Sequence, residues 1–157
     1  MMNEKRLIDF IIESNAIEGI QRPPTDEEIA EFKRFIALDK IPIKDVKKFI
    51  TVYAPGRILR NKIGLNVSVG GYYAPVGGAY ITKKLRWILD DMEINGPYKT
   101  HVEYELLHPF NDGNGRSGRA IWAWMMNRQK DGWSRQAWHS LGFLHTFYYQ
   151  ALSNARK

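Results

Sequence analysis

The chain is organised around residues 108–119, which run His-Pro-Phe-Asn-Asp-Gly-Asn-Gly-Arg-Ser-Gly-Arg and are called the motif stretch below. Glycines at positions 113 and 115 let consecutive backbone N–H groups converge into an anion-binding concavity without a Cβ penalty. From about Asn114 the residues suit a helix, and a helix N-terminus favours phosphate. Arg116 and Arg119 share a face of that helix because they are three residues apart. The stretch therefore predicts a phosphate-binding loop at the start of a helix.

Two more side chains of the motif stretch carry chemistry. Asp112 could hold a Mg²⁺ ion that bridges phosphate oxygens, since Mg²⁺ prefers one or two carboxylates together with substrate and water. His108 precedes a proline, which disfavours helical geometry and so predicts a helix end at this position. There the imidazole would stand at the rim of the concavity, where it can take a proton.

A transition-metal site is the rival interpretation of this region. His101, Glu105 and His108 are spaced by four and three residues, so they share a helix face, and Asp112 follows. The spacing is not that of the His-Glu-x-x-His motif, and a metal site leaves the glycines and arginines of the motif stretch without a role. We therefore disfavour a metallohydrolase, interpret His101 as structural, and expect Glu105 to accept hydrogen bonds from loop N–H groups.

Length and composition indicate one globular domain over residues 1–157. Hydrophobic residues make up 44% of the chain and charged residues 25%, which is ordinary for a folded protein. The absence of cysteine excludes disulfides, thiolate metal sites and a cysteine nucleophile. No apolar run approaches the length of a membrane span, and the acidic N-terminal region is unlike a signal peptide. We expect a cytoplasmic protein and leave open its secretion into a host cell.

The formal net charge is +6 and the pI is about 9.5, which points to acidic partners such as a nucleotide, a nucleic acid or an acidic protein surface. The basic residues are spread over several predicted helices rather than gathered in one tail. Solvated helix faces explain such a distribution, so nucleic-acid binding is not expected.

Hydrophobic periodicity predicts a mainly helical (all-α) fold with one small β-hairpin. The expected helices cover about residues 4–18, 25–39, 42–53, 79–94, 98–107, 114–130 and 134–155. Gly19 is placed to end the first helix, and Thr25 with Glu28 forms a capping-box pattern at the second. The apolar stripe of helix 79–94 is Tyr80, Leu85, Ile88, Leu89 and Met92. Core packing is expected of Trp122, Met125, Trp138, Leu141, Leu144, Tyr148 and Leu152.

The hairpin is predicted within residues 56–78, where the hydrophobic period switches from helical spacing to two. Leu65, Val67 and Val69 alternate with polar or small residues, and glycines 70 and 71 offer a tight turn. A lone hairpin is marginal by itself, so it must lean on helices or be completed by another strand.

The motif stretch resembles the Fic (filamentation induced by cAMP) family, whose motif His-Pro-Phe-x-Asp/Glu-Gly-Asn-Gly-Arg-x-x-Arg it matches at every position. The resemblance covers about residues 8–130. It implies a helical Fic fold and transfer of AMP from Mg-ATP to a Tyr, Thr or Ser hydroxyl of a target protein. The roles that it implies are a general base for His108, Mg²⁺ binding for Asp112, phosphate contacts for Gly113, Asn114 and Gly115, stabilisation of the departing diphosphate for Arg116, and γ-phosphate binding for Arg119.

Two other segments take part in the resemblance. Residues 56–78 look like the family's flap, which docks the target protein by strand addition, here along Asn66, Val67, Ser68 and Val69. Residues 14–19, Ser-Asn-Ala-Ile-Glu-Gly, resemble the family's inhibitory pattern Ser/Thr-x-x-x-Glu-Gly/Asn, within a helix over about residues 4–19. A carboxylate can take the fork of an arginine in parallel hydrogen bonds. We therefore expect Glu18, supported by Ser14, to pair with Arg119 and to hold the enzyme autoinhibited.

Three functional classes stay open. The favoured one is an autoinhibited protein AMP-transferase with ATP and a target protein as partners. The others are a Fic-fold transferase of a different phosphate-containing group and a non-catalytic nucleotide-binding regulator. The Gly-Asn-Gly-Arg sequence favours AMP, and the intact His108 favours catalysis. No membrane partner is expected, and a homo-oligomer is left open.

Overall fold

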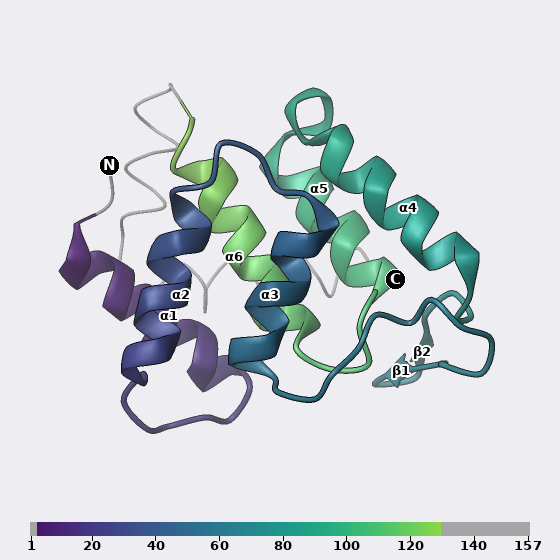
Figure 1. Ribbon diagram of the computed structural model, residues 1–157, viewed down its shortest axis with the longest axis horizontal. Coiled ribbons are helices and arrows are strands. Elements are labelled where there is room, and N and C mark those ends of the chain that lie inside the picture. Colours follow the sequence, from purple (N-terminus) through teal and green to yellow (C-terminus); the bar gives the residue numbers. More distant parts are fainter. Residues whose placement is uncertain (1–2, 130–157) are drawn as a thin grey trace.

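The computed structural model describes residues 3–129, which form six helices and one two-stranded antiparallel sheet (Figure 1). The elements in chain order are α1 (Glu4–Ile17), α2 (Asp26–Ile36), α3 (Ile43–Tyr53), β1 (Ser68–Val69), β2 (Tyr72–Tyr73), α4 (Ala79–Asp90), α5 (Met92–Leu107) and α6 (Asn114–Met126). The mainly helical fold with one small hairpin is confirmed. The helix expected over residues 134–155, with its five core positions from Trp138 onward, lies outside the described residues.

Helix α6 is the central element of the described part of the molecule. It packs against α5 on one side and against α1, α2 and α3 on the other, while α4 covers α5 (Figure 1). All six helices contribute to one hydrophobic core, which includes a run of aromatic rings from Phe10 through Phe32 and Phe49 to Tyr53. Within residues 3–129, no helix is long and apolar enough to cross a membrane.

The ends of α1 and α2 follow local sequence signals. Thr25 Oγ1 accepts from the Glu28 N–H at 3.1 Å and Glu28 Oε1 accepts from the Thr25 N–H at 2.8 Å, which confirms the capping box. Gly19 has φ 78°, and it donates to the Ala16 carbonyl while the next residue donates to the Asn15 carbonyl, both at 3.0 Å. This Schellman arrangement ends α1 immediately after Glu18, its C-cap. The carboxylate of Glu18 therefore projects from a defined helix end.

The break expected at residues 95–97 is present, because Gly96 has the non-helical angles φ 80° and ψ 170° within α5. Other expected boundaries are wrong. α4 ends at Asp90 rather than near residue 94, and α2 ends at Ile36 rather than near residue 39. Pro42 is the N-cap of α3 rather than a residue of its first turn, and α6 ends at Met126 instead of near residue 130. Tyr80, expected in the apolar stripe of α4, is half exposed, whereas the other stripe positions are buried.

The hairpin is shorter than the alternating pattern predicted. Only Ser68↔Tyr73 and Val69↔Tyr72 are paired, with the turn at glycines 70 and 71 as expected. The hairpin contacts α5, where the Tyr72 hydroxyl donates to the Leu106 carbonyl at 2.8 Å. Most of residues 61–67 therefore form an irregular approach to β1 rather than a strand.

A buried arginine ties the hairpin to the end of α5. The Arg60 side chain is 0% exposed and donates to the carbonyls of Leu107 and His108 at 2.8 and 2.7 Å. It also donates to the carbonyls of Leu65 and Pro75, both at 2.9 Å, on the two sides of the hairpin. Burial lowers the pKa of the guanidinium, and among the described residues no carboxylate pairs with it. Its charge is therefore balanced by carbonyl dipoles, two of them at a helix C-terminus, where a cation is favoured.

Replacing Arg60 tests how far the fold depends on this cation. Arg60→Met keeps much of the volume but leaves four carbonyls without their donor, so we expect a loss of more than about 4 kcal/mol of unfolding free energy. Arg57→Met is the matched control, because Arg57 is half exposed and should change stability by less than about 0.5 kcal/mol. Urea denaturation measures both variants. Equal stability of the two would show that the carbonyl contacts contribute little.

Candidate active site

The motif stretch is held in place by backbone pairing with residues 58–60. Leu59 and Phe110 form an isolated antiparallel bridge, flanked by hydrogen bonds from Arg60 N–H to the Pro109 carbonyl at 2.8 Å and from Asn111 N–H to the Ile58 carbonyl at 3.1 Å. The Asn111 side chain adds a third bond, since its Oδ1 accepts from the Ile58 N–H at 2.8 Å. The connection between α5 and α6 is thus fixed by the segment that leads into the hairpin.

Asn114 closes the loop upon itself. Its side chain is buried, its Oδ1 accepts from the Phe110 N–H at 2.8 Å, and its Nδ2 donates to the Phe110 carbonyl at 2.7 Å. In the first turn of α6, the Ser117 hydroxyl donates to the Gly113 carbonyl at 2.8 Å. The Asn114 amide therefore shapes the loop, and in this structure it is turned toward the protein backbone, although the motif implied a phosphate contact.

The N-terminus of α6 carries no side-chain cap. Its N-cap is Gly113, at φ 84°, which has no side chain to accept from the first helical N–H groups. The first N–H groups of a helix have no partner within the helix, so at this end they are left to water or to an anionic ligand. An uncapped helix N-terminus therefore lies where the two glycines predicted a phosphate site, and the site itself stays a prediction.

His108 stands at the end of α5 in the left-handed region, with φ 52° and ψ 62°. It is the one non-glycine residue with positive φ among residues 3–129, and as the C-cap of α5 it lies at the helix end that the following proline predicted. The conformation costs energy, and it is held because the His108 carbonyl accepts from Arg60 and its N–H donates to the Tyr104 carbonyl at 3.0 Å. Nδ1 lies 3.4 Å from the Glu105 carbonyl, which can only accept, so this contact is a hydrogen bond in the tautomer that carries its hydrogen on Nδ1.

Arg119 is the most enclosed cation of the motif stretch, with 1% of its surface exposed. Its Nε donates to Ser14 Oγ at 2.8 Å, and its Nη2 donates to the Ser14 carbonyl at 3.0 Å and to Glu18 Oε1 at 2.6 Å. The expected contact between the end of α1 and Arg119 is therefore present. Glu18 itself is 36% exposed, so the ion pair lies at the surface of the site rather than in the core.

Gly115 makes room for this ion pair. A Cβ at position 115 would overlap Glu18 Oε1 and would lie 3.0 Å from Arg119 Nη1. The Glu18 carboxylate thus lies against the first turn of α6, where the helix dipole favours an anion. This is the position that the sequence assigned to phosphate.

The remaining charged residues of the motif stretch are Arg116 and Asp112. Arg116 is buried and donates through Nη1 to the Tyr53 carbonyl at the end of α3, while its buried Nε has no hydrogen-bond partner among residues 3–129. Asp112 is largely exposed, its Oδ1 accepts from the Gly113 N–H at 2.8 Å, and its Oδ2 lies 3.8 Å from Arg57 Nε. The loop therefore presents one oriented carboxylate and a guanidinium with an unmet donor.

Two residues of the rival metal site, His101 and Glu105, are buried against α6. His101 is buried with Nδ1 3.1 Å from the Gly118 carbonyl, in keeping with a structural role. The Glu105 carboxylate is also buried, 3.8 Å from His101 Nε2, and it lies so close to Gly118 of α6 that a Cβ there would overlap it. Among residues 3–129, no group of three or more such side chains could hold a metal ion.

The flap residues Asn66, Val67, Ser68 and Val69 lie on the first arm of the hairpin, with β1 formed by the last two. Asn66 Oδ1 accepts from the Gly77 N–H at 2.9 Å, which closes the base of the hairpin. Sequence reasoning missed Arg60, Asn111 and Tyr72 as supports of the site. Their contacts with His108, Ile58 and Leu106 span 34 to 53 residues of the sequence, so no local signal could have found these contacts.

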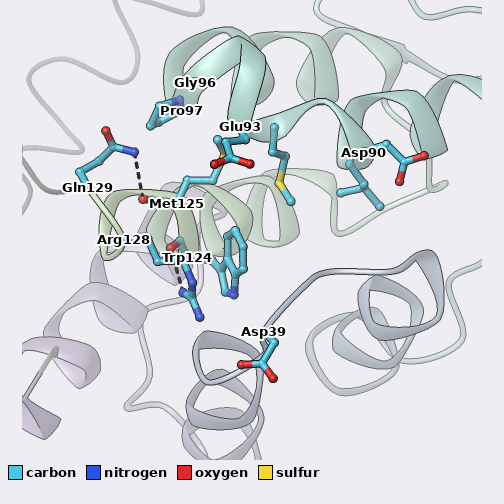
Figure 2. Close-up of a pocket in the computed structure, with 11 residues that line it drawn as sticks. Asp39, Asp90, Glu93, Gly96, Pro97, Trp124, Met125, Arg128 and Gln129 are labelled. Carbon is cyan, nitrogen blue, oxygen red and sulfur yellow. Dashed lines mark hydrogen bonds between the residues drawn. The ribbon is translucent and has the colours of Figure 1, made fainter.

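A cavity of about 700 Å³ lies elsewhere, among the ends of α2, α4 and α6 and the kink of α5. Figure 2 shows Trp124, Arg128 and Gln129 on one side of it and Glu93, Gly96 and Pro97 on the other. No residue of the motif stretch is among its described lining residues, so we assign it no part in the chemistry.

Residues 70–126 match the model of the Fic/DOC family. The matched span begins at the hairpin turn and ends at the last residue of α6, which is just over a third of the chain. It includes the whole motif stretch and suggests a transferase of the Fic fold. Helix α1, with Ser14 and Glu18, lies outside it. No curated protein and no solved structure matches the chain.

Alanine at position 113 tests the close packing of the loop. A Cβ there would lie 2.9 Å from both Ala54 Cβ and Ile50 Cδ1, in a left-handed conformation. Gly56→Ala is the matched control, because Gly56 has φ 82° and nothing within 4 Å. Both variants carry the backbone penalty, and Gly113→Ala should cost about 1–3 kcal/mol more because of overpacking. If urea denaturation shows the same loss of unfolding free energy for both variants, the side chains of α3 accommodate the added methyl group and the packing claim is wrong.

Proposed function

We propose that the protein is an AMP-transferase, which moves AMP from ATP to a Tyr, Thr or Ser hydroxyl of a target protein and is held back by its own α1. The observation that carries the proposal is the Glu18 carboxylate bonded to Arg119 beside Gly115, at an uncapped helix N-terminus. A carboxylate at this position imitates a phosphate oxygen pair, which supports a phosphate site next to His108.

In the proposed reaction, the target hydroxyl oxygen forms a bond to the α-phosphorus while the bond from that phosphorus to the diphosphate oxygen breaks. His108 Nε2 takes the hydroxyl proton, so the products are the AMP-ester of the protein, diphosphate and a protonated imidazole. The contact of Nδ1 with the Glu105 carbonyl supports this role, because it orients the ring and leaves Nε2 as the base. Much of the remaining catalysis is positioning and charge stabilisation.

Arg116 and Arg119 would contact different phosphates of ATP. Arg116 would stabilise charge on the departing diphosphate, and its buried Nε without a partner supports an anion there. Arg119 would bind the γ-phosphate after Glu18 has left. Gly113 and Gly115 would hold phosphate oxygens through backbone N–H groups, whereas we now give the Asn114 side chain the task of shaping the loop.

Asp112 fits Mg²⁺. It is a single, largely exposed carboxylate whose orientation is set by the Gly113 N–H, and Mg²⁺ favours one or two such ligands together with phosphate oxygens and water. When bound, the ion neutralises charge between the α- and β-phosphates. The hairpin would dock the target, because the outer edge of β1 has no strand neighbour among the described residues and can accept an extended segment.

Autoinhibition follows from the same contact. While Glu18 occupies Arg119, the γ-phosphate cannot reach its guanidinium, and the α-phosphorus is misaligned for attack. A coupling of this kind is worth about 1–3 kcal/mol, or about 5- to 150-fold, and misalignment adds about 10²-fold in rate.

Glu18→Gly should therefore raise self-labelling by radiolabelled ATP strongly. Glu4→Gly is the matched control on the same helix, because Glu4 is exposed and pairs with Lys33, far from the motif stretch. The double variant Glu18→Gly/His108→Ala should lose about 10²- to 10⁴-fold relative to Glu18→Gly while still binding ATP. Mass spectrometry identifies the added group. Equal labelling of wild type and Glu18→Gly would refute autoinhibition, and a mass gain other than AMP would refute the proposed substrate.

Asp112→Asn, made in the Glu18→Gly protein, should weaken Mg-ATP binding and flatten the dependence of labelling on Mg²⁺. Asp90→Asn removes an exposed carboxylate outside the motif stretch and should leave both unchanged. Calorimetric titration with Mg-ATP and labelling across a Mg²⁺ series are the measurements. A normal Mg²⁺ dependence in Asp112→Asn would remove Asp112 from the metal site.

A further inference from the structure

One long segment of the chain holds no acidic residue. Residues 46–89 contain no aspartate or glutamate, and their eight basic residues are Lys47, Lys48, Arg57, Arg60, Lys62, Lys83, Lys84 and Arg86. Because the whole chain has a formal net charge of +6, this segment carries +8 and the remainder of the chain carries −2. The positive charge therefore belongs to α3, the hairpin and α4, rather than being spread evenly over the helices.

Three of these cations lie on the surface near the hairpin. Lys62, Lys83 and Arg86 are exposed. Lys62 is at the base of the hairpin, because its carbonyl lies against Gly77, two residues before α4 begins. Lys83 is in the first half of α4 and Arg86 in its second half, and α4 rises directly from the hairpin in Figure 1. None of the three forms an ion pair within the described part of the chain.

The same region exposes large apolar side chains. Ile63 is 96% exposed, Tyr73 82% and Val76 71%, and all three belong to the hairpin and its approach. Tyr80 and Trp87 of α4 are about half exposed. A gathering of exposed apolar residues between polar ones is typical of an interaction site. We call Lys62, Ile63, Tyr73, Val76 and Lys83 the hairpin surface.

We propose that the hairpin surface binds an acidic, extended polypeptide segment that also carries apolar side chains. This rests on the proposed AMP transfer, since it names the class of protein segment that presents the hydroxyl. The segment's backbone would pair with the unpaired edge of β1, its carboxylates would face Lys62 and Lys83, and its apolar side chains would contact Ile63 and Tyr73. A nucleic acid could use the cations and the rings, but it has no amide backbone for the strand edge.

The test measures binding of fluorescent peptides to the Glu18→Gly protein by anisotropy. One peptide holds a tyrosine and two leucines among glutamates, and the second has lysines in place of the glutamates. The acidic peptide should bind at least about tenfold more tightly at low salt, with a difference that shrinks at higher ionic strength. Equal binding of the two peptides, or no binding of either, would overturn the proposal.

Charge reversal locates the surface. Lys62→Glu/Lys83→Glu should weaken binding of the acidic peptide about tenfold and strengthen that of the basic peptide. The matched control is Lys40→Glu/Lys99→Glu, which makes the same change at two exposed lysines outside residues 46–89 and should have little effect. Equal effects of the two double variants would overturn the assignment to the hairpin. Displacement of the peptide by a single-stranded oligonucleotide, with no preference for the acidic peptide, would show a nucleic-acid surface instead.

Self-labelling by ATP is recorded in the same samples. If the Glu18→Gly protein labels itself but shows no preference for the acidic peptide, the inference about the partner fails and the proposed AMP transfer stands. If it binds the acidic peptide but never becomes labelled, the proposed activity fails, and with it the claim that this surface presents a substrate.

Discussion

The structure depends on the buried guanidinium of Arg60. Four carbonyls converge on it, two from the end of α5 and two from the sides of the hairpin. Taking a cation out of water costs several kcal/mol, and hydrogen bonds from a charged donor return about 1.5–3 kcal/mol each, so the arrangement is stable only when all its partners are in place. Arg60 therefore helps to hold both the strained backbone of His108 and the hairpin, and it connects the proposed docking site with the proposed base.

Arg119 is buried as deeply, but its partners are of a different kind. Its partners include Ser14, through both the hydroxyl and the carbonyl, and a partly exposed carboxylate at the C-terminal end of α1. A negative charge at a helix C-terminus is disfavoured by the helix dipole, so Glu18 gains its stability from Arg119 and from the N-terminus of α6. Phosphate offers the same two groups a comparable partner. The proposed exchange between an inhibited and an active state rests on this equivalence of carboxylate and phosphate as partners of Arg119.

The formal charge is unevenly distributed along the chain. Residues 46–89, which include most of α3 and α4, carry +8, whereas the remainder of the chain carries −2. The segment that leads into the hairpin lies next to the motif stretch, because residues 58–60 pair with residues 109–111. ATP and an acidic target segment would thus be drawn to the same side of the molecule by one field.

The sequence by itself determined the features that depend on neighbouring residues. The capping box of Thr25 and Glu28, the end of α1 at Gly19 and the hairpin turn at glycines 70 and 71 were all predictable, because each is decided within a few positions. The family motif likewise identified the loop before α6. Only the tertiary structure decided that Arg60 holds His108, that Asn111 pairs with Ile58, and that the Asn114 amide faces the loop backbone. The first two of these contacts join residues about 50 positions apart, and the third depends on a loop whose path those contacts set. Periodicity and turn signals describe a residue's neighbours in the chain, and they carry no information on which distant carbonyl will meet a buried donor.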